Sequence, residues 1–344
     1  MAKKKNILLI YTGGTIGMVK DYKTNSLLPF DFSNLRKRIP ELNQLPCKIK
    51  TITFKTPIDS SNMNPKYWID IINIIQKHYE TTDGFVILTG SDTMSYTASA
   101  ISFMLENLCK PVIFTGSQLP IGDLRTDAKE NVITAIEIAS AYKNEEPIIK
   151  EVGLYFEYKL YRGNRTTKIN SEHFDAFSSP NFPHLAESGV HLSFQEHLLL
   201  QKKSSKKLIV RKKLNQNVVI LKLFPGITEK TIETILNLKD LKGVILETFG
   251  SGNAPTKKGI ITLLKQAINR GIQIINVTQC ITGSVNMGLY ETSSQLKEIG
   301  IISGKDITTE AALAKLMYLL GEEVEYLKFK EYFENPLRGE MTVL

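Results

Sequence analysis

The sequence has little from which a metal centre or a disulfide framework could be built. Its 344 residues include 3 cysteines and 5 histidines. Cys47, Cys109 and Cys280 lie far apart and form no CxxC pair, so we predict neither a zinc site nor a set of disulfides. No metal and no organic cofactor is therefore expected, and this use of cysteine favours a reducing compartment.

Long apolar runs are also missing from the sequence. A membrane-spanning helix needs about 20 consecutive apolar residues, and no segment approaches that length. The apolar run that ends at Tyr11 is too short for the core of a signal peptide and predicts a first β-strand instead. We therefore expect a cytoplasmic protein with no membrane partner.

An excess of positive charge raises the question of a nucleic-acid partner. The 43 Lys and Arg residues outnumber the 35 Asp and Glu residues and leave a formal charge of +8. The basic residues concentrate in residues 3–5 and 202–213, and neither run is interleaved with the aromatic residues on which bases stack. We interpret both runs as solvated surface and expect no nucleic-acid partner.

The length predicts two domains, and 42% hydrophobic residues are enough for large cores. In the first half, short apolar runs alternate with helical patterns, as in a parallel sheet with helices on both faces. The predicted strands there are residues 6–11, 48–54, 84–88, 111–114 and 152–156, and the predicted helices are residues 68–78, 92–108 and 127–142.

A second run of alternation starts at Val218. It predicts strands at residues 218–223, 243–247 and 273–277, and helices at 231–238, 258–269 and 310–320. The polar, basic stretch before it has the composition of a linker. The predicted fold is therefore α/β with two domains. Residues 1–200 form the larger one around a doubly wound, mostly parallel sheet, residues 201–216 the linker, and residues 217–344 a smaller α/β domain.

Three predicted strands of the first half end in turns that combine hydroxyl side chains with glycine. These turns are Thr-Gly-Gly-Thr at residues 12–15, Thr-Gly-Ser-Asp at 89–92 and Thr-Gly-Ser at 115–117. In an open parallel sheet, ligands bind outside the carboxyl ends of the strands. Glycine lets backbone amides approach a ligand closely, and a hydroxyl can serve as a nucleophile or hydrogen-bond donor. The three turns are therefore expected to converge on one pocket.

Each turn also has a purely structural interpretation. The first lacks the Lys-Ser/Thr ending of a P-loop and the spacing of a dinucleotide-binding loop. Ser91 and Asp92 could simply cap the helix that follows them, since serine is a favoured N-cap and aspartate suits a first helical turn. Ser60 and Ser61 could be ordinary loop residues. Spacing alone predicts a pocket without naming a reaction.

A general base for a hydroxyl nucleophile is not evident among the histidines. All 5 histidines lie outside the three turns, which disfavours a Ser/His/Asp hydrolase. Lys168 is an alternative, because a buried lysine beside other cations can have its pKa lowered enough to act as a base. The commoner state of a lysine is a surface position, and the local sequence alone favours that interpretation.

Taken together, these segments resemble the signatures of the L-asparaginase family. The resemblance is carried by Tyr-Thr-Gly-Gly-Thr-Ile-Gly at residues 11–17, Gly-Ser-Asp-Thr-Met at 90–94 and Gly-Asn-Arg-Thr-Thr-Lys at 163–168. Asp-Ser-Ser at 59–61, Gly-Asn-Ala-Pro at 252–255 and Thr-Gln-Cys at 278–280 take their places in the family order. The chain is most similar in pattern to the bacterial type I, cytoplasmic branch.

The resemblance implies hydrolysis of L-asparagine to L-aspartate and ammonia without a cofactor. Thr15 would be the nucleophile and form an acyl-enzyme, while Ser91, Asp92 and Lys168 would activate it and then water. Backbone amides of the first turn and near Ser91 would stabilise the oxyanion.

Substrate binding would fall to the side chains of Asp59, Ser60, Ser61, Ser91 and Asp92. A small zwitterion needs hydroxyl or amide donors at one end and a carboxylate at the other, which these residue types supply.

The resemblance also implies features around the catalytic residues. Tyr22, in a lid over residues 18–29, and Tyr290 are both candidates for a tyrosine that assists Thr15. Relatives assemble as homo-oligomers, dimers or tetramers. Some bind asparagine at a regulatory site through an arginine where Glu247 stands here. A carboxylate would repel that of the substrate, so regulation is expected to be absent or altered.

Two other functions stay open at this point. An asparaginase-like subunit of a tRNA-dependent amidotransferase would carry an extra N-terminal domain, for which a turn beginning at Thr12 leaves no room. A non-catalytic amino-acid sensor would keep the pocket, but binding alone would not require Lys168.

Overall fold

The computed structural model describes residues 4–20, 27–29, 39–201, 206–288 and 291–343. The chain folds into two compact units, residues 1–211 and 212–344. Both units are α/β, and the first contains the larger sheet, so the predicted fold class is confirmed.

The first unit is built on a mixed sheet of eight strands. Its spatial order is β15 (Leu192–Phe194), β14 (Ala186–Ser188), β11 (Lys159–Arg162), β10 (Val152–Phe156), β7 (Val112–Thr115), β5 (Gly84–Leu88), β1 (Lys5–Gly13) and β4 (Cys47–Ile58). The strands from β4 to β10 are parallel, whereas β11, β14 and β15 extend the sheet antiparallel. The apolar runs predicted the parallel strands. They did not predict the antiparallel extension, whose strands are too short to show a clear period.

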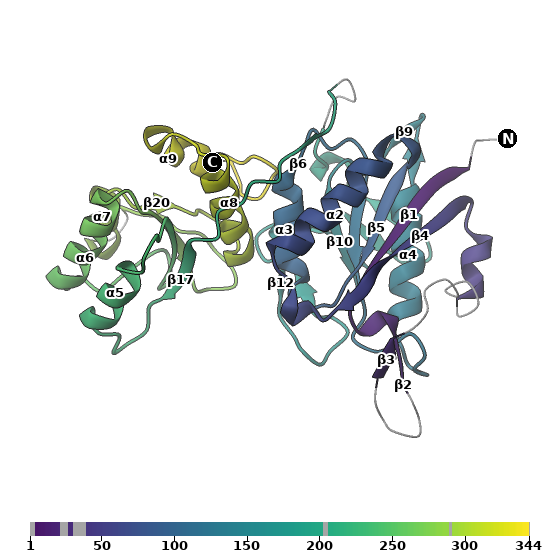
Figure 1. Ribbon diagram of the computed structural model, residues 1–344, viewed down its shortest axis with the longest axis horizontal. Coiled ribbons are helices and arrows are strands. Elements are labelled where there is room, and N and C mark those ends of the chain that lie inside the picture. The colour runs from purple at the N-terminus through teal and green to yellow at the C-terminus, as the bar shows by residue number, and fades with distance from the viewer. Residues whose placement is uncertain (1–3, 21–26, 30–38, 202–205, 289–290, 344) are drawn as a thin grey trace. The chain divides into compact units, whose positions relative to one another are not determined.

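Helices cover both faces of this sheet (Figure 1). Helices α2 (Pro65–His78) and α3 (Met94–Met104) lie side by side, and α4 (Ala128–Ser140) covers the opposite face. A hydrogen bond of 3.1 Å from Trp68 Nε1 to Thr97 Oγ1 joins α2 to α3. The first part of the chain is therefore doubly wound, as its alternating pattern predicted.

Burial on both faces explains why β1 reads as a continuous apolar run. Ile7 and Leu9 point to one face, where they share a core with Val132 and Ile136 of α4. Leu8 alternates to the other face and is equally buried. A strand covered on two sides has no polar positions that would reveal its period.

The helix predicted at residues 92–108 is shorter than expected. It begins at Met94 and ends at Met104. Leu105–Glu106 instead forms strand β6, which pairs antiparallel with β16 (Ile209–Val210). This pairing joins segments about 100 residues apart in the sequence, so helical periodicity could not reveal it.

Short elements complete the first unit. The hairpins pair β2 (Met18–Lys20) with β3 (Leu27–Pro29), β8 (Tyr142–Lys143) with β9 (Glu146–Pro147), and β12 (Thr167–Lys168) with β13 (Phe177–Ser178). Single 3₁₀ turns occur at Thr15–Gly17, Pro40–Gln44, Ser60–Asn62, Tyr79–Thr81, Gly163–Arg165 and Glu196–Leu198.

The second unit has a four-stranded, wholly parallel sheet. Its strands are β17 (Val218–Lys222), β18 (Gly243–Thr248), β19 (Gln273–Thr278) and β20 (Ile302–Ser303), and its helices are α5 (Glu229–Leu236), α6 (Lys258–Asn269), α7 (Glu291–Glu298), α8 (Thr309–Gly321) and α9 (Tyr326–Glu334). The three longer strands, α5, α6 and α8 agree with the sequence prediction. Helix α9 was not predicted, because few of its residues are buried.

A buried ion pair fastens the C-terminal segment to α8. Lys315 Nζ lies 2.5 Å from Glu340 Oε1, and both side chains have no exposed surface. The ammonium also donates to the carbonyls of Phe333 and Asn335 at 2.7 Å. Removing one partner of such a pair leaves an uncompensated buried charge, at a cost of about 3–5 kcal/mol.

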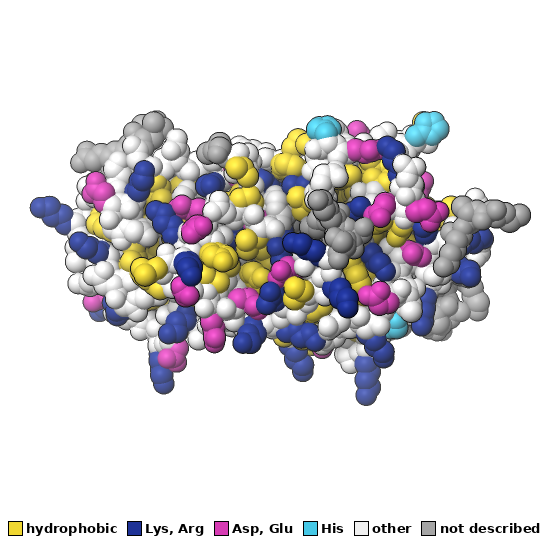
Figure 2. Space-filling model, turned by 90° about the horizontal axis from the view of Figure 1, so that it is seen from above, with side chains coloured by type: hydrophobic (Ala, Val, Ile, Leu, Met, Phe, Trp, Pro, Cys, Tyr) yellow, Lys and Arg dark blue, Asp and Glu magenta, His cyan; other side chains and the backbone are white. Residues whose placement is uncertain are grey.

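One face of the surface is mixed in charge. On the face shown in Figure 2, basic and acidic side chains are interspersed, so this face carries no field of a single sign. Among the residues that the structure describes, no helix combines the length and the apolar character required to cross a bilayer.

Buried tyrosines should make the first unit sensitive to alkaline pH. Burial raises the pKa of Tyr11, Tyr79 and Tyr161 to about 12 from the ordinary 10.0. Above pH 10 the unfolded chain gives up these protons while the folded chain keeps them, so stability should fall as the pH rises from about 10 to about 12. Denaturant unfolding at pH 8, 10, 11 and 12 measures the decline.

Substitution separates this effect from general alkaline damage. Tyr161→Phe removes one titrating hydroxyl and should make the decline shallower. Tyr158→Phe, at a side chain that is 52% exposed, should leave the decline as it is. Equal slopes in the two variants would contradict the assignment to buried hydroxyls.

Candidate functional site

The order of strands points to one place in the first unit. The parallel strands lie in the spatial order β4, β1, β5, β7 and β10. The chain starts in β1 and adds β4 on one side of it and β5, β7 and β10 on the other, so the topological switch point lies between β1 and β5. Ligands of open α/β sheets bind outside the carboxyl ends of the strands at such a point. These are the strand ends that carry the hydroxyl-glycine turns.

The turns contact one another through their glycines, as their positions in the sequence predicted. A Cβ built on Gly14 would lie 2.3 Å from the backbone nitrogen of Gly90. One built on Gly90 would lie 2.6 Å from Ser60 Oγ, and one on Gly116 would lie 2.5 Å from the carbonyl oxygen of Thr89. No side chain fits in these gaps, so glycine is required for the strand ends to meet.

The first turn contains two threonines that differ in burial. Thr12 is fully buried, and its hydroxyl donates to the carbonyl of Leu88 at 3.1 Å, which ties β1 to β5. Thr15 is only partly buried and begins a 3₁₀ turn directly after Gly14. Of the two hydroxyls, that of Thr15 is the one not committed to joining the strands.

Lys168 lies against the second turn. It stands in β12, and its ammonium donates to Ser91 Oγ at 2.8 Å and to Asp92 Oδ1 at 2.6 Å. The side chain of Lys168 is 17% exposed, whereas that of Asp92 is 64% exposed. The neighbours of the amine are thus a hydroxyl and a carboxylate, not the other cations that the sequence analysis considered.

Ser91 and Asp92 do not cap α3, so the capping interpretation is wrong. The N-cap of α3 is Thr93, and its side chain makes no capping hydrogen bond. Thr93 Oγ1 donates instead to the carbonyl of Ser60 at 2.7 Å. Ser91 Oγ donates to Gln118 Oε1 at 3.2 Å. Gln118 was not singled out from the sequence, although it directly follows the third hydroxyl-glycine turn.

The segment after β4 approaches the same place. Ser60 Oγ donates to Asp92 Oδ2 at 3.4 Å, so the two carboxylate oxygens of Asp92 have different partners. Asp59 Oδ1 accepts hydrogen bonds from the backbone and hydroxyl of Ser61, at 2.8 and 2.6 Å. These bonds lower the pKa of the Asp59 carboxyl, which is therefore ionised at neutral pH.

Three more residues were singled out from the sequence. Tyr22 and Tyr290 lie outside the described residues. Glu247 stands in β18, where its Oε1 accepts a hydrogen bond of 2.8 Å from Thr309 Oγ1 and its Oε2 lies 3.5 Å from Lys222 Nζ. The carboxylate at the position of the expected regulatory arginine is thus already paired within its own unit.

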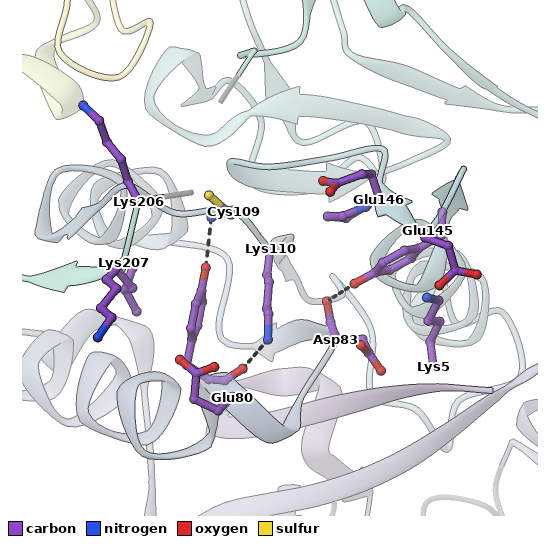
Figure 3. Close-up of a pocket in the computed structure, with 13 residues that line it drawn as sticks. Lys5, Glu80, Asp83, Cys109, Lys110, Glu145, Glu146, Lys206 and Lys207 are labelled. Carbon is purple, nitrogen blue, oxygen red and sulfur yellow. Dashed lines mark hydrogen bonds between the residues drawn. The ribbon is translucent and has the colours of Figure 1, made fainter. Parts of the chain in front are cut away.

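A separate cavity of about 540 Å³ opens at the amino ends of the parallel strands (Figure 3). Several side chains that line it form hydrogen bonds or ring contacts at those strand ends. Lys110 Nζ donates to the Thr82 carbonyl at 2.8 Å, Tyr142 Oη donates to the Asp83 carbonyl at 2.8 Å, and Lys5 Nζ lies 3.7 Å from the Tyr142 ring centre. The hydroxyl-glycine turns lie at the opposite ends of these strands, where we place the functional site.

The chemistry available at the strand ends is that of hydroxyls, an amine and carboxylates. Within the described ranges, His, Cys, Asp and Glu side chains nowhere gather in a group of three or more that could hold a metal ion. The turn of the partly buried Thr15 contacts the turn that carries the Lys-Ser-Asp cluster, and these are residue types used for nucleophilic attack with proton transfer.

Two family profiles match this chain. The profile described as "Asparaginase, N-terminal" matches residues 6–200, and the one described as "Glutaminase/Asparaginase C-terminal domain" matches residues 217–333. Together they cover most of the sequence.

Individual relatives resemble the chain over its whole length. L-asparaginase 1 of Escherichia coli strain K12 is 42% identical, with 99% of both chains covered. The 60 kDa lysophospholipase of Mus musculus is 38% identical, with 100% of this chain but 64% of the mouse protein covered. The crystal structure of L-asparaginase I from Vibrio cholerae superposes with a TM-score of 0.90 at 41% identity, covering 99% of this chain and 100% of that one.

The glycine contact between the first two turns can be tested by adding one methyl group. Gly14 has φ 90° and ψ 170°, which L side chains rarely adopt. Gly14→Ala combines backbone strain of about 1–3 kcal/mol with a clash against Gly90, so it should lower the free energy of unfolding by more than about 3 kcal/mol.

Gly189→Ala is the matched control in the same unit. Its Cβ would meet only the His191 carbonyl at 3.9 Å, so a change of no more than about 0.5 kcal/mol is expected in denaturant unfolding. Similar effects of the two substitutions would show that the strand ends tolerate a side chain.

Proposed function

The chain belongs to the asparaginase family, and on this premise we propose that it hydrolyses L-asparagine to L-aspartate and ammonia. The observation that carries the proposal is the contact between the turn bearing Thr15 and the turn whose Ser91 and Asp92 hold Lys168. The substrate is supported by the name of the Escherichia coli relative. The mouse relative is much longer than this chain, so the activity in its name is not carried over.

In the proposed first step, Thr15 Oγ attacks the carbon of the substrate's side-chain amide. An ester forms between Thr15 and the acyl group, the C–N bond breaks, and ammonia leaves with the proton that Thr15 gives up. Backbone amides of Gly13, Gly14 and the residues near Ser91 stabilise the negative oxygen, a contribution of roughly 3–4 kcal/mol for each donor in comparable sites.

In the second step, water attacks the ester and releases L-aspartate. Ser91 and Lys168 activate first Thr15 and then water, because a proton can pass along the hydrogen bond of 2.8 Å that joins them. Asp92, at 2.6 Å from the Lys168 amine, stabilises the positive charge whenever that amine carries a proton.

Binding of the zwitterionic substrate is assigned to the residues around these catalytic groups. The anionic carboxylates of Asp59 and Asp92 suit the α-ammonium group, and the hydroxyls of Ser60, Ser61 and Ser91 suit the α-carboxylate. The exposure of Asp92, at 64%, supports this role because its carboxylate is open to a ligand.

Finer features belong to the same proposal. We expect a cytoplasmic enzyme of the type I kind, which the low cysteine content of the sequence supports, and a homo-oligomer, either dimer or tetramer. A non-catalytic sensor is the competing function. It is distinguished by aspartate raising the melting temperature of a protein that releases no ammonia.

Replacement of the nucleophile tests the reaction directly. Purified protein should release ammonia from L-asparagine, and Thr15→Ala should retain less than about a hundredth of the wild-type kcat, since general-base assistance to a hydroxyl is worth roughly 10²–10⁴. L-Glutamine assayed alongside measures specificity. Release that persists in the variant would exclude Thr15 as the nucleophile.

Replacement of the lysine tests proton transfer. Lys168→Met keeps most of the aliphatic side chain and removes the amine, so it should lower kcat far more than it raises KM. Lys143→Met serves as the control, since Lys143 forms a surface ion pair with Glu196 at 2.8 Å and is 61% exposed. A change confined to KM would make Lys168 a residue that binds substrate.

A further inference from the structure

The side-chain amide of Gln118 lies between the catalytic cluster and the loop that follows Lys168. Its Oε1 accepts the hydrogen bond of 3.2 Å from Ser91 Oγ, and its Nε2 donates to the carbonyl of His173 at 3.0 Å. The backbone nitrogen of Gln118 donates to the Asp127 carboxylate at 2.9 Å. Gln118 is thus held at both ends, by its backbone and by its terminal amide.

These partners determine which way the amide faces. A backbone carbonyl can only accept a hydrogen bond, so the nitrogen of the Gln118 amide must face His173. The oxygen then faces Ser91, and the Ser91 hydroxyl must donate to it. When its amine is protonated, Lys168 has only donors, so in that state it pairs with Ser91 through the oxygen's lone pairs. The hydrogen bonds therefore run in one direction, from Lys168 to Ser91 to Gln118.

Ser91 needs this support because its own backbone does not restrict its side chain. A serine lacks the second heavy substituent on Cβ that limits χ1 in threonine. Lys168 could follow the hydroxyl oxygen to more than one rotamer, since a lysine side chain is long and flexible. The fixed acceptor at Gln118 selects the rotamer in which Ser91 also contacts Lys168.

The loop that supplies the His173 carbonyl is itself ordered. Asn170 Oδ1 accepts hydrogen bonds from the backbone nitrogens of Glu172 and His173, at 2.9 and 3.0 Å. Ile169 donates to the carbonyl of Ala176 at 2.8 Å and closes the loop next to Lys168. Gln118 therefore connects Ser91 to the segment that also carries the amine.

We propose that Gln118 is a positioning residue that sets the rotamer of Ser91 and so keeps the Ser91 hydroxyl within reach of the Lys168 amine for proton transfer. The inference rests on the proposed amidohydrolase function and adds a residue to it. The contribution of Gln118 to kcat should therefore depend on whether residue 91 is serine. It should be smaller when residue 91 is threonine, because β-branching then restricts the same hydroxyl.

The test is a double-mutant cycle between Gln118→Met and Ser91→Thr, with ammonia release from L-asparagine as the readout. Gln118→Met keeps the volume and removes both amide hydrogen bonds. In the serine background it should lower kcat about three- to tenfold, as expected for one positioning hydrogen bond, with KM changed less than about twofold. In the Ser91→Thr background the same substitution should lower kcat less than about twofold.

Ser117→Ala is the matched control for disturbance of the loop. Its hydroxyl donates to the Leu119 carbonyl at 2.6 Å, next to Gln118, and neither group of that bond belongs to Ser91. Any loss from Ser117→Ala should be the same in both backgrounds, and melting temperatures establish that each variant is folded.

Equal losses from Gln118→Met in the two backgrounds, a loss confined to KM, or no loss with serine present would each overturn the positioning role while leaving the amidohydrolase intact. Failure of the proposed function would show differently, because the unsubstituted protein would then release no ammonia from L-asparagine. Rescue by Ser91→Thr is the result that supports the inference.

Discussion

The contact between Gly14 and Gly90 is the constraint on which the whole site depends. Parallel strands in this order bring the carboxyl ends of β1 and β5 together, but only residues without a Cβ allow the two turns to touch. With both glycines in place, the residues that follow them, Thr15 and Ser91, reach the same edge of the sheet. Backbone packing thus determines where the hydroxyls of Thr15 and Ser91 lie.

The polar groups at this edge hold one another in a chain. Lys168 contacts Ser91 and Asp92, Ser60 contacts the second oxygen of Asp92, and Gln118 accepts from Ser91. These residues come from four separate segments of the first unit, so the cluster exists only when the fold is complete. A site assembled in this way is oriented before substrate arrives, which is the condition under which electrostatic stabilisation is most effective.

Charge is placed differently at the site and in the core. The ion pairs Lys315–Glu340 and Arg162–Glu151 are almost wholly buried. If either partner turned to another group, the charge it left behind would be buried and unpaired. Asp92 pairs with Lys168 at a comparable distance but keeps most of its surface open to solvent. In the proposed function, a carboxylate in that state contacts the ammonium group of the substrate while it keeps its ion pair with Lys168.

The sequence by itself determined the strands and helices with strong apolar patterns, the two-unit α/β architecture, and the residue types collected at the strand ends. Only the tertiary structure decided that Ser91 binds Gln118 and Lys168 rather than capping α3, and that the helix ends at Met104 to let β6 pair with β16. The physical reason is the distance along the sequence over which each interaction acts. Periodicity and turn preferences depend on residues a few positions apart, whereas Lys168 donates to the hydroxyl of a residue 77 positions away, and no local pattern encodes that hydrogen bond.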